Sequence, residues 1–414
     1  MTLRCFTALP GILFAALACA EPSYRNFDEP PHNYHKAPLK DRFTKLKADL
    51  ESRHIPLDHR SEKAFVLSLL KLLDIPASSQ MLVFSTTSLQ LRLITPSNPR
   101  ALYFSDELYV GYIPGGKIEL ISMDPELGGI FYMFDIPRDE RPLTIERSEK
   151  CVNCHTREDT GFVPGLVVKS VVPGPTGGSI KAFRREQTGH GIPFEERFGG
   201  WYLTGNHAIT GHWANTIGRL APDGITKLAV EPGTRFDFAR YPVATSDILP
   251  QLVFEHQAGF ANRILEASYR ARTAFHLDKA KLSPAHYAEL DEQARIVTRY
   301  MLFADEVPLP PGGVEGDAAF RTDFVRGGRV SGNGATLREF DLRTRLFRYR
   351  CSYMIYSPEF VGLPAKMKQH IYLKLREALS TEKPAKDYAY LPAAEKSAIR
   401  TILKATLQDL PSGW

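Results

Sequence analysis

The spacing of apolar residues predicts helices near the beginning of the chain. Apolar positions recur every three or four residues over 43–50 and again from Glu62 to Leu73, where Pro76 follows shortly after. This period matches one face of an α-helix, and a proline ends such a pattern. We therefore expect an N-terminal helical segment over residues 21–80.

After Met81 the pattern changes to short apolar runs. Such runs, separated by turn residues, are typical of β-strands, and Pro114-Gly115-Gly116-Lys117 is a good hairpin turn. The expected strands span 81–84, 89–94, 101–104, 108–113, 118–122 and 130–134. They predict an antiparallel β region over residues 81–145.

The remainder of the chain begins with loops and returns to helical spacing. Residues 147–215 include the glycine-rich stretches 173–178 and 199–202, which predicts a long loop region. Helices are expected over 246–272, with Ser246-Asp247 as N-cap, and over 284–303, 364–379 and 392–407. The Pro/Gly-rich stretch 308–316 is the best candidate for a domain boundary. We therefore predict an α+β fold: a small antiparallel sheet region, a loop-rich region with helices over 146–307, and a mainly helical C-terminal region over 317–414.

Composition and charge narrow the class of protein. The chain has 414 residues, of which 43% are apolar, and this is enough for a large core. The formal net charge of +5 is small for this length, and no basic run is interleaved with aromatic residues. We therefore expect no nucleic acid as a main partner.

The first residues are typical of a secretory signal. Arg4 precedes an apolar run over 6–18, and Ala18-Cys19-Ala20 is a small-residue cleavage site. We expect a signal peptide over 1–20 and export to the periplasm. A lipid anchor at Cys19 is the alternative, which we favour less because Ala16 occupies the position where leucine is usual. No later run is apolar and long enough to suggest a transmembrane helix in the mature chain.

The most specific chemical signal is the run Cys151-Val152-Asn153-Cys154-His155. Two thiols at this spacing can add to the two vinyl groups of a haem, and the histidine that follows can bind the iron as an axial ligand. A structural zinc site would need two more ligands, and a thioredoxin-like pair would need a βαβ context. The motif therefore predicts one covalent haem c, bound through Cys151 and Cys154 with His155 on the iron. Residues 146–307 become the expected haem-binding region.

The motif resembles that of the cytochrome c superfamily, over residues 151–155 alone. The whole mature chain also resembles a set of large, poorly characterised bacterial proteins with one c-type haem motif. The stretches that carry this resemblance are 98–104, 196–202, 255–257 and 351–356. It implies one integrated architecture with the haem in the middle, and it implies no activity. From cytochrome c it transfers roles only to Cys151, Cys154 and His155.

The second face of the iron is harder to assign. Small soluble cytochromes c commonly place a methionine downstream of the motif, but this chain has none between Met133 and Met301. We therefore expect a second ligand other than methionine, with His256, His207 and His212 as candidates. His256 falls on an apolar helical stripe, which also fits an ordinary core histidine. The other two lie in a segment rich in glycine and aromatic residues, which also fits an ordered surface loop.

The expected function is electron transfer with an unidentified redox partner, through a haem with two histidine ligands. A haem-dependent redox enzyme, peroxidase- or oxidase-like, is the first alternative, and a haem-based sensor is the second. The sequence leaves open whether the protein is an enzyme, and it assigns no catalytic residue.

Overall fold

A seven-stranded antiparallel sheet organises the first half of the chain. In the computed structural model, which describes residues 23–137, 142–183, 186–279 and 281–414, the strand order is β6-β5-β4-β3-β2-β1-β9. The strands are β1 Met81–Val83, β2 Arg100–Phe104, β3 Leu108–Tyr112, β4 Ile118–Asp124, β5 Gly128–Phe134, β6 Glu146–Arg147 and β9 Trp201–Tyr202. The first six form a meander, and β9 joins β1 from beyond the cysteine motif. The predicted signal peptide and Cys19 lie outside the described residues.

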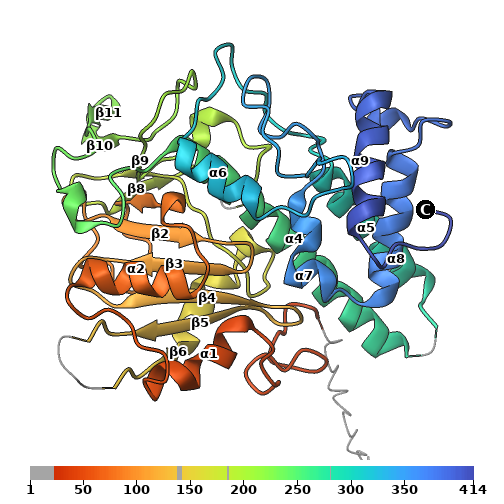
Figure 1. Cartoon of the computed structure of the whole chain (residues 1–414), viewed down its shortest axis with the longest axis horizontal. Helices are drawn as coiled ribbons and strands as arrows, with labels where there is room; N and C mark the ends of the chain where they lie inside the picture. Colours follow the sequence, from red (N-terminus) through yellow and green to blue (C-terminus); the bar gives the residue numbers. More distant parts are fainter. Residues whose placement is uncertain (1–22, 138–141, 184–185, 280) are drawn as a thin grey trace, which may run out of the picture.

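Two N-terminal helices cover one face of this sheet. Helix α1 (Arg42–Glu51) is capped by Asp41, and α2 (Glu62–Leu72) is capped by Ser61. The apolar stripe of α2 is buried together with every second residue of the central strands, including Tyr103. Figure 1 shows α2 lying across this face.

A long helix packs on the opposite face. Helix α4 (Ile248–Asp278) begins at the N-cap Asp247, and 31 residues form it. Its Phe254 ring lies 5.4 Å from the ring of Phe104 and 5.8 Å from that of Tyr109, both on the sheet. Residues on the second face of the sheet therefore pack with α4 in a separate apolar core.

The C-terminal helices complete this second core beside α4 (Figure 1). They are α5 Pro284–Met301, α6 Ala318–Arg326, α7 Pro358–Val361, α8 Ala365–Ala378 and α9 Ala393–Thr406. The segment between the sheet and α4 contains the short helix α3 Val152–His155 and the hairpins β7 Val171–Pro173 with β8 Ser179–Ala182, and β10 Thr216–Ala221 with β11 Gly224–Ala229. Among the described residues no helix combines the length and the apolar character needed to cross a bilayer.

The predicted α+β class is confirmed, and most expected elements are present. The strand expected over 89–94 is wrong: this stretch is a series of turns. Its leucines alternate as in a half-buried strand, but Leu89, Leu91 and Leu93 are 48%, 53% and 38% exposed. The sheet also extends beyond the predicted β region, because β9 pairs with β1. In the stretch 308–316, Leu309 and Val314 are buried in the core that α4 shares with the C-terminal helices.

Candidate haem-attachment site

The cysteine motif forms a turn of helix at the edge of the sheet. Strand β6 pairs with β5, and Ser148 N–H continues this pairing by donating to Phe131 O at 2.8 Å. The chain then enters a 3₁₀ turn that ends at Cys151 and continues into α3. Residues three and four apart lie on the same side of a helix. Cys151, Cys154 and His155 therefore share one side of a single turn.

The two thiols differ in their surroundings. Both cysteines are free thiols; Cys151 is half-buried and Cys154 is exposed. The Cys151 thiol lies 3.3 Å from the hydroxyl of Ser148, and burial raises its pKa. An exposed thiol beside a partly covered one allows a large planar group to approach from the solvent side.

His155 is held by one ring nitrogen. Its Nδ1 lies 2.8 Å from Gly165 O, and its ring lies 4.6 Å from the ring of Phe131 on β5. A carbonyl oxygen accepts only, so the proton is assigned to Nδ1. Burial lowers the pKa of His155 to about 4, with the backbone hydrogen bond acting in the opposite direction. The imidazole is therefore neutral at pH 7, with the lone pair of Nε2 available to a metal.

The carbonyl that orients His155 is itself fixed by α4. Asn262 accepts from Leu166 N–H and donates to Leu166 O, both at 2.8 Å. On the other side, Gly129 N–H of β5 donates to Pro164 O at 2.8 Å. A Cβ at Gly165 would lie 2.3 Å from Asn262 Oδ1, so this position requires glycine. Sequence reasoning missed both Gly165 and Asn262; the only local signal was the Pro164-Gly165 pair shortly after the motif.

A charged pair on the sheet lies beside the histidine. Arg100 Nη1 and Glu119 Oε2 are 2.8 Å apart, and both charges influence the pKa of His155. Burial acts to raise the pKa of Glu119, but Arg100 and two neutral donors outweigh it, so this pKa lies below its usual range. Arg100 Nε is buried without a hydrogen-bond partner in the described part of the chain. Buried donors are normally satisfied, so Arg100 suits the carboxylate of a haem propionate.

These residues together fit a c-type haem. The chain offers two thiols on one turn, a neutral histidine whose Nδ1 is fixed by a carbonyl, and a half-buried arginine whose buried Nε has no hydrogen-bond partner among the described residues. A ligating histidine ordinarily donates its second ring N–H to such an acceptor.

The structure places His256 in the core behind the sheet. Its Nδ1 lies 2.8 Å from Nδ1 of His190, and its Nε2 lies 2.8 Å from Oγ of Ser352. Its side chain is fully buried, and its ring stacks at 4.4 Å on Phe303. Burial lowers the pKa of His256 to about 3. Both ring nitrogens are therefore engaged within the protein, as for a structural core histidine.

His207 and His212 follow the strand at the other edge of the sheet. They follow β9, which forms the edge opposite to β6, from which the motif leads. Their rings are 5.6 Å apart, and His212 Nδ1 accepts from Ala214 N–H at 3.2 Å. Their recorded ring contacts are with each other and, for His212, with Phe198. Among the described residues, neither histidine shares a hydrogen bond or a ring contact with His155.

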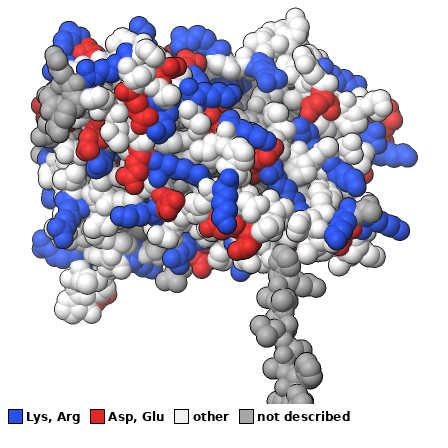
Figure 2. All heavy atoms as spheres, turned by 90° about the horizontal axis from the view of Figure 1, so that it is seen from below, with Lys and Arg blue, Asp and Glu red and all other residues white. Residues whose placement is uncertain are grey.

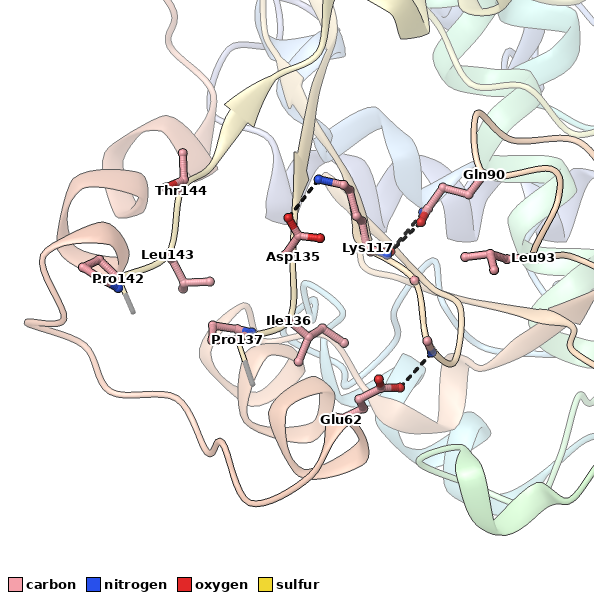
Figure 3. Close-up of a pocket in the computed structure, with 12 residues that line it drawn as sticks. Glu62, Gln90, Leu93, Lys117, Asp135, Ile136, Pro137, Pro142, Leu143 and Thr144 are labelled. Atoms are coloured by element: carbon pink, nitrogen blue, oxygen red, sulfur yellow. Dashed lines mark hydrogen bonds and ion pairs between the residues drawn. The ribbon is translucent and has the colours of Figure 1, made fainter. Parts of the chain in front are cut away.

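A cavity of about 580 Å³ lies at one end of the sheet. In Figure 3 Lys117 and Asp135 point toward each other across one side, with 2.9 Å between Lys117 Nζ and the carboxylate. Gln90 accepts from Lys117 N–H at 2.7 Å and donates to Glu119 at 2.9 Å. The cavity therefore borders the Arg100–Glu119 pair, but the motif does not line it.

Comparisons with known proteins add no relative: no family model, no curated protein and no solved structure matches the chain. Within the described ranges, no group of three or more His, Cys, Asp or Glu residues is arranged to hold a metal ion. That finding concerns sites built from protein ligands alone, whereas a haem iron takes at most two ligands from the protein.

Proposed function

We propose that this protein is an exported, periplasmic electron-transfer protein with one covalent haem c. The observation that carries the proposal is the state of His155. This residue follows two free thiols on the same helical turn, and its Nδ1 is committed to Gly165 O. Nε2 is thereby left available to the iron of a haem that the thiols would bind.

Attachment of the haem would be an addition reaction between the two thiols and the two vinyl groups. In each thioether the S–H bond of Cys151 or Cys154 adds across a vinyl double bond, so that sulfur bonds one carbon and hydrogen the other. The addition consumes no oxidant. When bound, the haem iron supplies one-electron exchange between its ferric and ferrous states. His155 would hold the iron, and Arg100 would pair with a propionate.

The surface is compatible with transient contact with a redox partner. Figure 2 shows basic and acidic side chains interspersed over the face seen from below. The net charge of +5 is small for the size of the chain. We expect an encounter that depends on local charge pairs and weakens as salt is added.

The first experiment tests the cofactor. The full chain is produced in a host that attaches haem c, and covalent haem is measured by intact mass and by absorption after denaturation. We expect Cys151→Ala and Cys154→Ala each to lose one thioether, and the double variant to lose covalent haem. Cys351→Ala, a change at the buried free cysteine, is the matched control and should keep both thioethers. Wild-type protein without covalent haem would refute the proposal.

The second part of the test concerns the role. An electron-transfer protein is six-coordinate, so its reduced form should bind no carbon monoxide at equilibrium and should exchange electrons with small redox mediators. His155→Ala should keep both thioethers and lose the low-spin spectrum. Avid carbon monoxide binding by the wild-type protein would contradict electron transfer and favour an open-site haem enzyme.

A further inference from the structure

The two faces of the sheet are covered unequally. Around the motif, residues facing α1 and α2 are buried, including Ala101, Leu120 and Tyr132. Their neighbours on the opposite face are only half-buried, and they are Arg100, Leu102, Glu119, Ile121 and Met133. The burial pattern therefore alternates along β2 and β4 and at the end of β5. One end of this face is left partly open beside the motif.

The strand register gathers these five side chains. Glu119 pairs with Gly111 on one side and with Met133 on the other. Leu102 pairs with Gly111, and Ile121 pairs with Phe131. Directly paired residues have Cβ atoms about 5 Å apart on the same face. The half-buried residues therefore form one continuous surface, which we call the open sheet face.

The ring of His155 lies against Phe131, on the same side of β5 as Met133. Its Nδ1 is turned to Gly165, whose neighbour Pro164 is bound to Gly129. Gly129 and Met133 lie on β5 on opposite sides of Phe131 and on the same face. The two nitrogens occupy different edges of the imidazole. Nδ1 is therefore committed to the segment that is bound at the Gly129 end of β5, which leaves Nε2 as the ring nitrogen available to a metal.

Met133 has the chemistry and the freedom of an iron ligand. Alternate residues of a strand are about 7 Å apart, so Met133 is the next side chain beyond Phe131 on the side away from Gly129. Its neighbours Tyr132 and Phe134 are buried in a core cluster, whereas Met133 belongs to neither cluster of the described residues. A thioether is an established axial ligand of haem c, and the flexible side chain can adjust its reach.

From this juxtaposition we infer that Met133 is the second axial ligand of the haem. The inference rests on the proposed function, and it replaces the downstream histidines with a methionine that precedes the motif. The haem would then stand on the open sheet face between His155 and Met133, with Arg100 beside it. Small soluble cytochromes c commonly have this methionine downstream of the motif, so the sequence alone does not single out Met133.

The test replaces one methionine at a time in the haem-loaded full chain. Met133→Leu removes the sulfur, and Met133→His supplies a different ligand. Met123→Leu is the matched control, because Met123 lies on the same sheet face and is buried in the core. The readouts are magnetic circular dichroism, carbon monoxide binding by the reduced protein, and the midpoint potential.

We expect the oxidised wild type to show the near-infrared charge-transfer band of a methionine–iron bond. Met133→Leu should lose this band, become high-spin and bind carbon monoxide, while Met123→Leu should match the wild type. Met133→His should remain low-spin at a lower potential. Absence of the methionine band in the wild type, or its persistence in Met133→Leu, would overturn the assignment.

The two proposals fail in distinguishable ways. A wild type without thioether-bound haem removes the proposed function and the ligand assignment together. A wild type with covalent haem whose spectrum is indifferent to Met133 removes only the ligand assignment. If Met133→Leu does not fold, Met133→His decides: loss of the methionine band in this variant supports the assignment, and persistence of the band overturns it.

Discussion

At the scale of single residues, the site depends on an amide far from the motif in sequence. Asn262 on α4 satisfies both backbone groups of Leu166, and this holds Gly165 O against His155. The orientation of the histidine is therefore set by a residue more than a hundred positions downstream.

Asn262→Ala should destabilise the protein by about 1–3 kcal/mol, because the buried N–H and C=O of Leu166 lose their partners. Urea unfolding of the haem-loaded protein measures the change in free energy. Asn333→Ala, in an exposed loop where the amide accepts locally, should cost less than about 0.5 kcal/mol. Equal stability of the two variants would show that Asn262 does not hold the loop. A shift of midpoint potential in Asn262→Ala alone would report the loosened carbonyl.

At the scale of elements, α4 and α5 enclose a buried chain of polar side chains. His190 and His256 share a hydrogen bond between their Nδ1 atoms, and His256 continues to Ser352. Tyr300 on α5 stacks on the His190 ring at 4.1 Å. One imidazole must donate and the other accept. Burial lowers the pKa of both histidines, so both rings are neutral at pH 7.

The two neutral buried histidines of this hydrogen-bonded series predict that the folded protein loses stability in acid. Burial lowers the folded-state pKa of His256 to about 3 and that of His190 well below its usual value, whereas unfolded histidine titrates near 6.5. The unfolded chain therefore takes up protons first as the pH falls. The stabilisation is complete above about pH 6.5 and decreases by roughly 1.4 kcal/mol per histidine and pH unit below it.

Urea unfolding at a series of pH values between 7 and 4 measures this slope. His256→Gln should reduce it by about one proton, while His54→Gln, at an exposed site, should leave it unchanged. His32 and His212, whose pKa values burial lowers to about 4, contribute to the slope that remains. An unaltered slope in His256→Gln would contradict the neutral buried pair.

The elements that were predictable are those with a strong local pattern. Phe65, Val66, Leu69 and Leu70 mark α2 by spacing alone, and Asp247 marks the start of α4. Alternating apolar residues led to the wrong prediction of a strand at Leu89. The same alternation can occur in exposed turns, where no neighbouring strand pairs with the segment. The hairpins β7–β8 and β10–β11 were not predicted, because glycine and proline interrupt the apolar pattern of such short strands.

The candidate site was predictable only where it is local. Cys151, Cys154 and His155 form a contiguous motif, so the proposed attachment chemistry follows from the local sequence alone. Gly165 and Asn262 matter through a tertiary contact between a loop and α4. The proposed role of Met133 depends on its register on β5. Neither relation leaves a periodic signal in the sequence.

At the scale of the whole molecule, the sheet joins two cores. Neighbouring residues of β1 face opposite ways: Leu82 enters the core with α2, and Met81 enters the core with α4. The N-terminal segment spans both, since Tyr34 O–H donates to Gly129 O at 2.5 Å and the His32 ring stacks at 4.2 Å on Tyr269 of α4. Neither core can be exposed without disrupting the sheet that they share.

We therefore expect one cooperative unfolding transition. Thermal curves followed by far-ultraviolet circular dichroism and by the haem absorption band should superimpose. Tyr34→Phe should lower both midpoints together, because it removes a buried hydrogen bond worth about 1 kcal/mol. Two separated transitions would show that the helical C-terminal part unfolds independently of the sheet.

The pairing of β1 with β9 has a consequence for the order of folding. Leu82 pairs with Tyr202, so the last strand is added only after about 120 further residues have emerged from the site of synthesis or export. Closing so long a loop is entropically costly and is expected late. Residues 151–155 lie within that loop. The motif thus emerges well before the sheet can close, and in this interval both thiols would be accessible on an open chain to the attachment that we propose.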